Sequence, residues 1–430
     1  MLNKKLLTSL TLIALGISTV HAQTDTLDKY QVPLNKYGAV DANAHIPLNV
    51  QVPAQPADFK LPQITTAAAI WSKQVPPQPT LDVASYIVMD AKSGNIIAQS
   101  DANKRIAPAS LTKLMLLYVV FEQLKAGTMS LDTQIQVPTV AWATGGSRMF
   151  LKPGSKVSVK DLLEGVIVAS GNDAAVTLAT YVAGTQEAFV DMMNQYAKKL
   201  GLTNTHFTTI MGLPAPNLYS SAYDMAKIGR DIILDFPQYY YMFKQKEFSY
   251  NGITQTNYNK LLFIDQYADG LKTGSTSEAG FSLVASEQQP DKTRLVAVVI
   301  GANNQKSSAT AAYTLLKYAN RFFTTDYVHM SNDPIGKLAV YKGEVNEIHY
   351  GTDGTVAITY PYNVKPSDLK TNVDIKQPLI APIAKGQTIG QLTVTYKDRT
   401  LAITPVVSLE SDPEGNIWQK MKGTVSLWLS

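Results

Sequence analysis

Three short patterns in this chain combine residue types that could carry out acyl transfer. They are Ser110-Leu111-Thr112-Lys113, Ser170-Gly171-Asn172 and Lys272-Thr273-Gly274. A serine hydroxyl is a poor nucleophile at neutral pH and needs an adjacent base. Lys113 lies one helical turn after Ser110 and can reach its hydroxyl, provided that the neutral amine is accessible. Lys272 would favour the neutral amine as a second nearby cation.

Each pattern alone has little weight, because the chain repeats two of them elsewhere. Ser367-Asp368-Leu369-Lys370 also reads S-x-x-K and Ser93-Gly94-Asn95 also reads S-x-N, whereas K-T-G occurs once. Only the set that begins at Ser110 has the order and spacing required for this chemistry. The combination therefore outweighs the alternatives of a helix-capping serine and a surface lysine.

The remaining polar groups have complementary roles in such a site. Ser170 could relay a proton to the leaving amine, and Asn172 could hold a substrate amide or fix Lys113. Backbone amides of Ser110 and Ser275 would form the oxyanion hole. The residues thus predict a serine acyltransferase or hydrolase with a lysine base. The chain has neither an H-E-x-x-H zinc pattern nor a G-x-S-x-G elbow, so we expect no metal and no cofactor.

Composition restricts the classes of protein that remain. With 430 residues, of which 45% are hydrophobic, the chain is long enough for two domains. The net charge of +4 is too small for a nucleic-acid partner. Because cysteine is absent, disulfides and thiolate metal sites are excluded.

The N-terminal region predicts export. Lys4 and Lys5 precede an apolar run over 6–20, and we expect a signal peptide, residues 1–22, cleaved after Ala22. A retained anchor is the alternative, but the run is shorter than the ~20 residues that span a bilayer. Residues 23–80 form a proline-rich extension that we interpret as a tether, with a partner-binding arm or a strap over the next domain as alternatives.

Periodicity beyond residue 80 predicts an α+β protein. Ser110 falls in the first turn of a buried helix, and strands at 281–286 and 294–300 form a hairpin. A helix over 309–323 closes the first domain, and short alternating segments after Tyr327 predict a small all-β domain. The two decoy patterns fall in a predicted hairpin turn and in this second domain.

The C-terminal tail predicts an amphipathic helix. Over residues 415–430 the lysines lie among the polar positions, and the apolar side chains share one face. These apolar residues are Ile417, Trp418, Met421, Val425, Trp428 and Leu429. Sixteen helical residues cover about 24 Å, too little to cross a hydrocarbon core of ~30 Å. We therefore expect binding to a membrane surface, with docking onto the β domain as the alternative.

The same residues resemble a known family, the low-molecular-weight penicillin-binding proteins of the D-alanyl-D-alanine carboxypeptidase type. The resemblance extends from about Leu81 to the C-terminus. It is carried by Pro108-Ala109-Ser110-Leu111-Thr112-Lys113, Ala141-Trp142-Ala143-Thr144-Gly145, Met149-Phe150-Leu151-Lys152-Pro153-Gly154, Ser170-Gly171-Asn172-Asp173-Ala174 and Asp269-Gly270-Leu271-Lys272-Thr273-Gly274.

The resemblance implies a β-lactamase-like catalytic domain over 81–328, with an antiparallel sheet flanked by helices. A β-rich domain over 329–410 and a membrane-surface helix over 411–430 would follow. The implied reaction removes the terminal D-alanine from peptidoglycan stem pentapeptides at the periplasmic face of the inner membrane, and β-lactams would acylate the same serine. The implied residues are Ser110 as nucleophile, Lys113 as base, Ser170 and Asn172 as the second motif, and Lys272, Thr273, Gly274 and Ser275 at the substrate-binding strand.

One departure concerns the substrate carboxylate, for which arginine is the usual partner. Relatives commonly have arginines near Tyr258 and after the K-T-G sheet, whereas residues 302–312 here offer only Lys306.

Two rival functions remain. A class A β-lactamase needs a deacylating glutamate, and none occurs between Gly201 and Gln245. A β-lactam-binding or peptidoglycan-binding protein with little turnover is the other.

Overall fold

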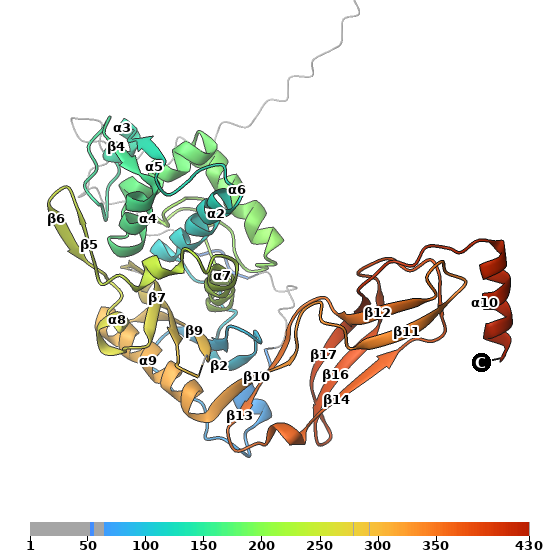
Figure 1. The fold of residues 1–430 in the computed structure, drawn as a ribbon. Coiled ribbons are helices and arrows are strands. Elements are labelled where there is room, and N and C mark those ends of the chain that lie inside the picture. Colours follow the sequence, from blue (N-terminus) through green and yellow to red (C-terminus); the bar gives the residue numbers. More distant parts are fainter. Residues whose placement is uncertain (1–51, 56–63, 278, 292, 430) are drawn as a thin grey trace, which may run out of the picture.

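A five-stranded antiparallel sheet forms the centre of the larger domain, with strand order β2-β1-β9-β8-β7 (Figure 1). The computed structural model describes residues 52–55, 64–277, 279–291 and 293–429. The predicted signal peptide and most of the predicted extension lie outside these residues. The strands are β1 (Ser85–Asp90), β2 (Ile96–Ser100), β7 (Ala268–Thr276), β8 (Gly280–Gln288) and β9 (Arg294–Ala302).

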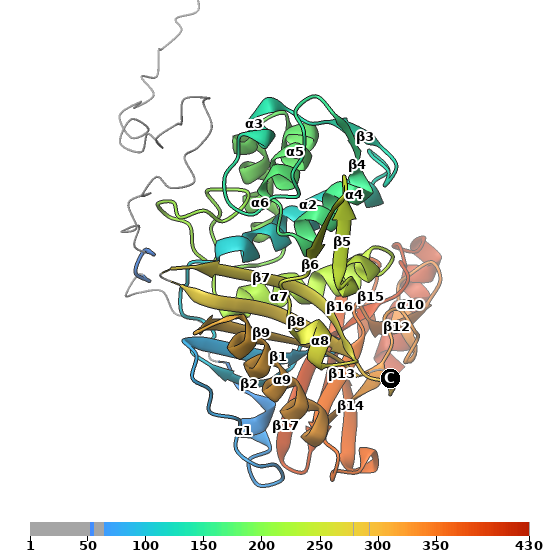
Figure 2. The same ribbon diagram turned by 90° about the vertical axis from the view of Figure 1, so that its left-hand side faces the viewer.

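Side chains on opposite faces of this sheet enter two different cores. Ile87 and Met89 of β1 pack in one core, and Tyr86 and Val88 in the other, because successive strand residues point to opposite faces. The first core is shared by α2 (Lys113–Lys125), α4 (Val159–Val168), α5 (Asn172–Ala183), α6 (Gln186–Lys199) and α7 (Ala222–Asp235). The second is covered by α9 (Gln305–Phe322), which crosses the sheet in Figure 2.

The predicted elements agree with this arrangement, with shifted bounds. The 281–286 and 294–300 hairpin is confirmed as β8 and β9. Helix α9 begins four residues before the predicted start at Ala309, because Asn304 and Ser307 form a capping box there. The shorter elements of the domain are β3 (Gln134–Gln136), α3 (Thr139–Trp142), β4 (Lys156–Ser158), β5 (Glu247–Tyr250), β6 (Ile253–Thr256) and α8 (Leu261–Ile264).

The second domain is all-β, as expected. Strand β10 (Phe323–His329) crosses the boundary drawn at residue 328 and pairs with β13 (Val356–Pro361). A six-stranded sheet follows, in the order β14-β16-β17-β12-β11-β15. Its strands are β11 (Gly336–Tyr341), β12 (Glu347–Thr352), β14 (Leu369–Ile375), β15 (Leu379–Ile380), β16 (Thr388–Tyr396) and β17 (Arg399–Ser408). Both decoys lie outside the catalytic grouping, Ser93 in the β1–β2 turn and Ser367 just before β14.

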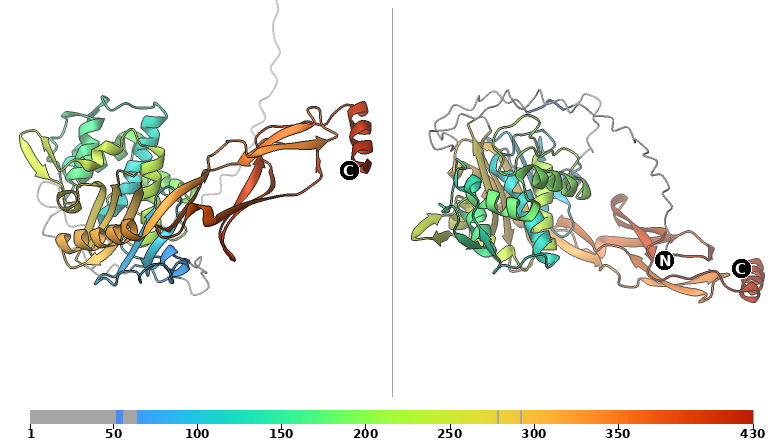
Figure 3. Two further views of the ribbon diagram at one scale, coloured as in Figure 1. Left: turned by 60° about the horizontal axis from the view of Figure 1, so that its bottom comes forward. Right: turned by 90° about the horizontal axis from the view of Figure 1, so that it is seen from above.

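Helix α10 (Ile417–Leu429) lies at the end of the second domain that is remote from the five-stranded sheet (Figure 3). One side contacts the end of β11, where Gln419 Nε2 donates to the Glu344 carbonyl at 3.2 Å. The apolar side faces outward, and Trp418 and Trp428 are 75% and 90% exposed. Within the described residues, every helix is too short or too polar to span a bilayer.

Residues 64–80, the described end of the proline-rich extension, contact both domains. Trp71 follows α1 (Ala67–Ile70) and is 1% exposed. The centroid of its ring lies 4.7 Å from the ring centroid of Tyr396 in the second domain. Arg399 donates a hydrogen bond to the Ile70 carbonyl. On the first domain, the Tyr318 hydroxyl donates to the Pro76 carbonyl at 2.7 Å. This segment therefore contributes to the contact between the domains.

We expect Trp71→Ala to destabilise the protein by about 3–5 kcal/mol, since it removes a large buried ring. The measurement is chemical denaturation followed by far-UV circular dichroism. Trp418→Ala is the matched control, because the same side chain is exposed there and its loss should cost less than about 0.5 kcal/mol. Equal stability of the Trp71 variant and the wild type would contradict a stabilising role for the contact between Trp71 and Tyr396.

Candidate active site

Ser110 lies in a tight turn that leads into the central helix of the larger domain. The turn is a 3₁₀ segment, Ala109–Thr112, and α2 continues from it, so the predicted position in a first helical turn is nearly correct. Ala109 has a φ of +47°. Gly212 packs against this turn so closely that a Cβ atom there would come 1.7 Å from the Ala109 carbonyl oxygen. Only glycine is compatible with that approach.

Lys113 is directed back at the serine from the start of α2. Its side chain is completely buried, and its Nζ donates to Ser110 Oγ at 2.9 Å and to the Met211 carbonyl at 3.2 Å. Burial lowers the pKa of Lys113 well below its usual value, the neighbouring Lys272 lowers it further, and Asp173 opposes both. The amine is therefore held in contact with the hydroxyl in an environment that favours its neutral form.

Lys272 lies on the edge strand β7 and is also buried, with 1% of its surface exposed. Burial lowers the pKa of Lys272 to about 7. Its Nζ donates to the carbonyl of Thr273 at 3.1 Å. The two lysines of the S-x-x-K and K-T-G patterns are thus brought together behind the site, as the sequence predicted.

The second motif joins the helical part of the domain to the site. Ser170 has a φ of +54°, and its buried Oγ has no hydrogen-bond partner within the described residues. Asn172 begins α5 and donates from Nδ2 to the Gly145 carbonyl at 2.7 Å, so it fixes the neighbouring loop. Asp173 was not among the predicted site residues. Its carboxylate accepts the amides of Met149 and Leu151, each at 3.0 Å, and shapes the same loop.

Gly274 allows β7 to approach the serine turn. A Cβ atom at this position would lie 3.0 Å from the Leu111 nitrogen and 3.1 Å from the Pro108 carbonyl oxygen, both backbone atoms. The strand edge after Lys272 therefore runs alongside Ser110. This proximity explains physically why a glycine ends the K-T-G pattern.

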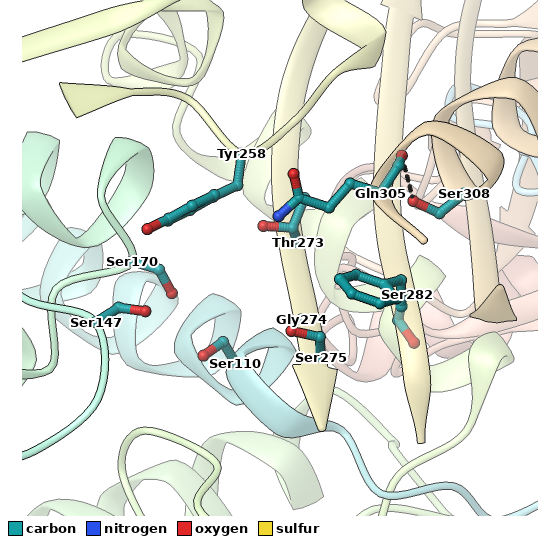
Figure 4. A pocket seen from close by; sticks show the side chains of 11 residues that line it. Ser110, Ser147, Ser170, Tyr258, Thr273, Gly274, Ser275, Ser282, Gln305 and Ser308 are labelled. Carbon is teal, nitrogen blue, oxygen red and sulfur yellow. Dashed lines mark hydrogen bonds between the residues drawn. The ribbon is translucent and has the colours of Figure 1, made fainter. Parts of the chain in front are cut away.

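These elements surround a cavity of about 190 Å³ (Figure 4). The predicted residues on its wall are Ser110, Ser170, Thr273, Gly274 and Ser275, whereas Lys113, Asn172 and Lys272 support the wall from behind. Sequence reasoning missed the other lining residues, apart from its remark on Tyr258. They are Ser147, Tyr258, Phe281, Ser282, Gln305 and Ser308. Only the tertiary structure brings them to the serine, and none belongs to a short pattern of its own.

Other potential catalytic groups lie elsewhere or in other contacts. Glu164 Oε1 accepts a hydrogen bond from Gln245 Nε2 and forms an ion pair with Lys160 Nζ, each at 2.8 Å. Glu164 does not line the cavity. Among the described residues, no group of three or more His, Cys, Asp or Glu side chains could hold a metal ion. The groups at this cavity that suit acyl transfer are the serines, the lysines and the backbone amides.

Comparison with known proteins agrees with this geometry. Residues 72–304 match the family model of D-alanyl-D-alanine carboxypeptidase, and residues 323–414 match that of the penicillin-binding protein 5 C-terminal domain. The chain is 40% identical to D-alanyl-D-alanine carboxypeptidase DacC of Escherichia coli strain K12 over 361 residues, which cover 82% of this chain and 90% of the relative.

Solved structures give the same result. Penicillin binding protein 5 from Haemophilus influenzae matches with a TM-score of 0.73 and 38% identity, covering 78% of this chain and 99% of that protein. Penicillin binding protein 6B from Escherichia coli matches with a TM-score of 0.64 and 38% identity, covering 77% and 98%. The chain belongs to the serine-type D-alanyl-D-alanine carboxypeptidase family and carries the C-terminal domain of penicillin-binding protein 5.

Proposed function

We propose that this protein removes the terminal D-alanine from peptidoglycan pentapeptides through an acyl-enzyme on Ser110. The observation that carries the proposal is the 2.9 Å hydrogen bond from the buried Lys113 amine to Ser110 Oγ. The neutral amine accepts the hydroxyl proton as Oγ attacks the carbonyl carbon, and the D-alanine amine leaves. Water then attacks the ester in the second half of the reaction.

Ser170 and the strand edge complete the proposed machinery. The unpartnered Ser170 hydroxyl lines the same cavity as Ser110, which supports a role in passing the proton to the leaving amine. The backbone amides of Ser110 and Ser275 are the proposed oxyanion hole, since β7 and the serine turn run in close contact at Gly274. Thr273 and Gly274 are assigned to the wall that binds the substrate, and Asn172 and Lys272 to the residues that support the cavity from behind.

The rival functions differ in how the acyl-enzyme decays. A β-lactam opened by Ser110 would form the same ester, and rapid hydrolysis of that ester needs a positioned base such as a glutamate. The described lining of the cavity contains no glutamate, and this favours a carboxypeptidase over a β-lactamase. A binding protein with little turnover would acylate equally well, so release of D-alanine decides between the remaining two.

We further propose export and attachment to the periplasmic surface of the inner membrane. The predicted signal peptide supports export. The outward apolar face of α10, with Trp418 and Trp428 beside lysines, supports binding at a lipid–water interface. Because α10 is remote from the five-stranded sheet, the second domain would act as a spacer between the membrane and the active site (Figure 1).

A first prediction from the proposed function is that Lys113→Met lowers release of D-alanine from diacetyl-Lys-D-Ala-D-Ala by about 10²–10⁴-fold, because it removes the proposed base. Ser110→Ala should abolish both release and labelling by a fluorescent penicillin. Lys125→Met, in the same helix but exposed, is the matched control and should leave turnover unchanged. Acylation without D-alanine release would support the binding protein, and rapid nitrocefin turnover would support a β-lactamase.

A second prediction concerns stability. The pKa of Lys272 is about 7 in the folded protein and has its ordinary value of 10.5 in the unfolded chain. The cost of burying its charge is therefore present at its full size below pH 7. Lys272→Met should therefore raise the free energy of unfolding at pH 7, by up to about 4 kcal/mol, while abolishing activity.

The sign of this effect depends on pH. Between pH 7 and 10.5 the unfolded wild type binds more protons than the folded wild type, so its stability rises with pH and the advantage of the Met variant shrinks. Urea denaturation at pH 7 and pH 9.5 measures this difference. An advantage that stays constant or grows with pH would show that Lys272 is not buried in its charged form.

A third prediction concerns the tail. A chain that ends at Asn416 keeps the hydrogen bonds of Asp412 to the amides of Val345 and Asn346, so the second domain should remain folded. We expect its binding to vesicles with anionic lipid to fall by at least about tenfold, with turnover of small peptides unchanged. Full-length protein with Trp418→Gln and Trp428→Gln should behave in the same way. Undiminished sedimentation with vesicles would place the membrane contact elsewhere.

A further inference from the structure

Among the residues that the structure describes, the wall of the active-site cavity carries no charged side chain. Its eleven lining residues are serines, one threonine, one glycine, Tyr258, Phe281 and Gln305. A carboxypeptidase substrate ends in a carboxylate, which is bound most strongly by a charged donor such as a guanidinium. The cavity offers hydroxyl and amide groups in that role.

The two lysines behind the wall do not supply a free cation. Lys113 is completely buried and donates to Ser110 Oγ and the Met211 carbonyl. Lys272 is 1% exposed, donates to the Thr273 carbonyl, and is only partly protonated at neutral pH because its pKa is about 7. Lys113 thus contacts the serine hydroxyl, and Lys272 lies close enough to Lys113 to lower its pKa.

Apart from the two buried lysines, the cations nearest in sequence to the lining residues are directed elsewhere. Lys260, two residues after Tyr258, lies over the ring of Phe263, 5.5 Å from the centroid. Lys306 follows Gln305 but lines a different cavity, together with Asp82 and Thr310. Arg148 follows Ser147, and its guanidinium lies over the ring of Phe150, 5.9 Å from the centroid. None of these side chains belongs to the wall of the active-site cavity.

The N-terminus of α9 also borders the cavity, through Gln305 and Ser308, and a helix N-terminus attracts anions. Here the chain caps its own helix. The Ser307 amide donates to Asn304 Oδ1 at 2.8 Å, and the Ser308 amide donates to the Asn304 carbonyl at 3.0 Å. These two amides are therefore already occupied.

The described lining residues that can bind the C-terminal end of the substrate are uncharged. Their polar groups can both donate and accept hydrogen bonds. Figure 4 shows the Gln305 side chain reaching from α9 toward Thr273, and the Tyr258 ring lying across the cavity toward Ser170. A primary amide and a hydroxyl each donate and accept hydrogen bonds. They can bind a carboxylate and a carboxamide with similar strength, whereas a guanidinium can only donate.

We propose that this enzyme does not require a free carboxylate after the scissile bond and also hydrolyses D-alanyl peptides with an uncharged C-terminus, with Gln305 and Tyr258 as the residues that permit this. The inference rests on the proposed function of the Ser110 site. The reaction is the same hydrolysis. Ser110 Oγ bonds to the carbonyl carbon, the C–N bond breaks, D-alaninamide leaves with the proton, and water releases the acyl group as a carboxylate.

The test compares diacetyl-Lys-D-Ala-D-Ala with its C-terminal carboxamide, measuring release of D-alanine and of D-alaninamide. We expect kcat/KM for the two peptides to agree within about tenfold, the difference between neutral and charge-assisted hydrogen bonds. A preference for the acid above about thirtyfold would overturn the inference and leave the carboxypeptidase function intact. Failure to cleave either peptide, with penicillin acylation intact, would overturn both.

Variants assign the property to named residues. Gln305→Arg should raise the preference for the acid by about tenfold, and Tyr258→Arg, on the other side of the cavity, should act in the same direction. Lys306→Gln and Arg148→Gln are charge-removing controls and should leave the ratio unchanged. Penicillin labelling checks that each variant is folded. If Arg148→Gln or Lys306→Gln selectively weakens cleavage of the acid, that cation binds the carboxylate and the inference is wrong.

Discussion

The burial of two lysines beside one serine is the constraint on which the rest of the structure depends. Lys113 and Lys272 are almost completely inaccessible, and burial lowers the pKa of both. Removing such groups from water costs several kcal/mol. The five-stranded sheet has a core on each face, and its extensive apolar burial offsets this cost. Stability given up at the site thus maintains a neutral amine next to a hydroxyl.

Close backbone contact keeps the reactive groups in register. Gly212 and Gly274 both face the serine turn. A Cβ atom at Gly212 would collide with its backbone, and one at Gly274 would be in tight contact with it. Strand β7 is fixed from its other end by a buried network, in which Arg294 pairs with Asp269 and Ser286 Oγ donates to Asp269 at 2.7 Å. Rigid support of this kind suits a site in which a displacement of 1 Å would separate the base from its hydroxyl.

The second domain is joined to the catalytic domain through residues 64–80 as well as through the chain itself. Trp71 packs against Tyr396. The segment that precedes the five-stranded sheet therefore contacts the second domain, although the two are far apart in the sequence. Helix α10 lies at the remote end of that domain (Figure 3). Its apolar side chains are exposed. The same chain therefore presents an active-site cavity, whose described lining is uncharged, at one end and an amphipathic helix at the other.

The sequence by itself determined the reaction class and predicted two domains and the proposed catalytic residues Ser110, Lys113, Ser170 and Lys272, because short patterns and periodicity are local. It also indicated the β8–β9 hairpin and the amphipathic tail for the same reason. Only the tertiary structure decided that Asn172 fixes the Gly145 loop, that Trp71 joins the domains, and that Tyr258 and Gln305 meet at the serine. These contacts join residues far apart in the chain, and packing determines which distant side chains share one cavity.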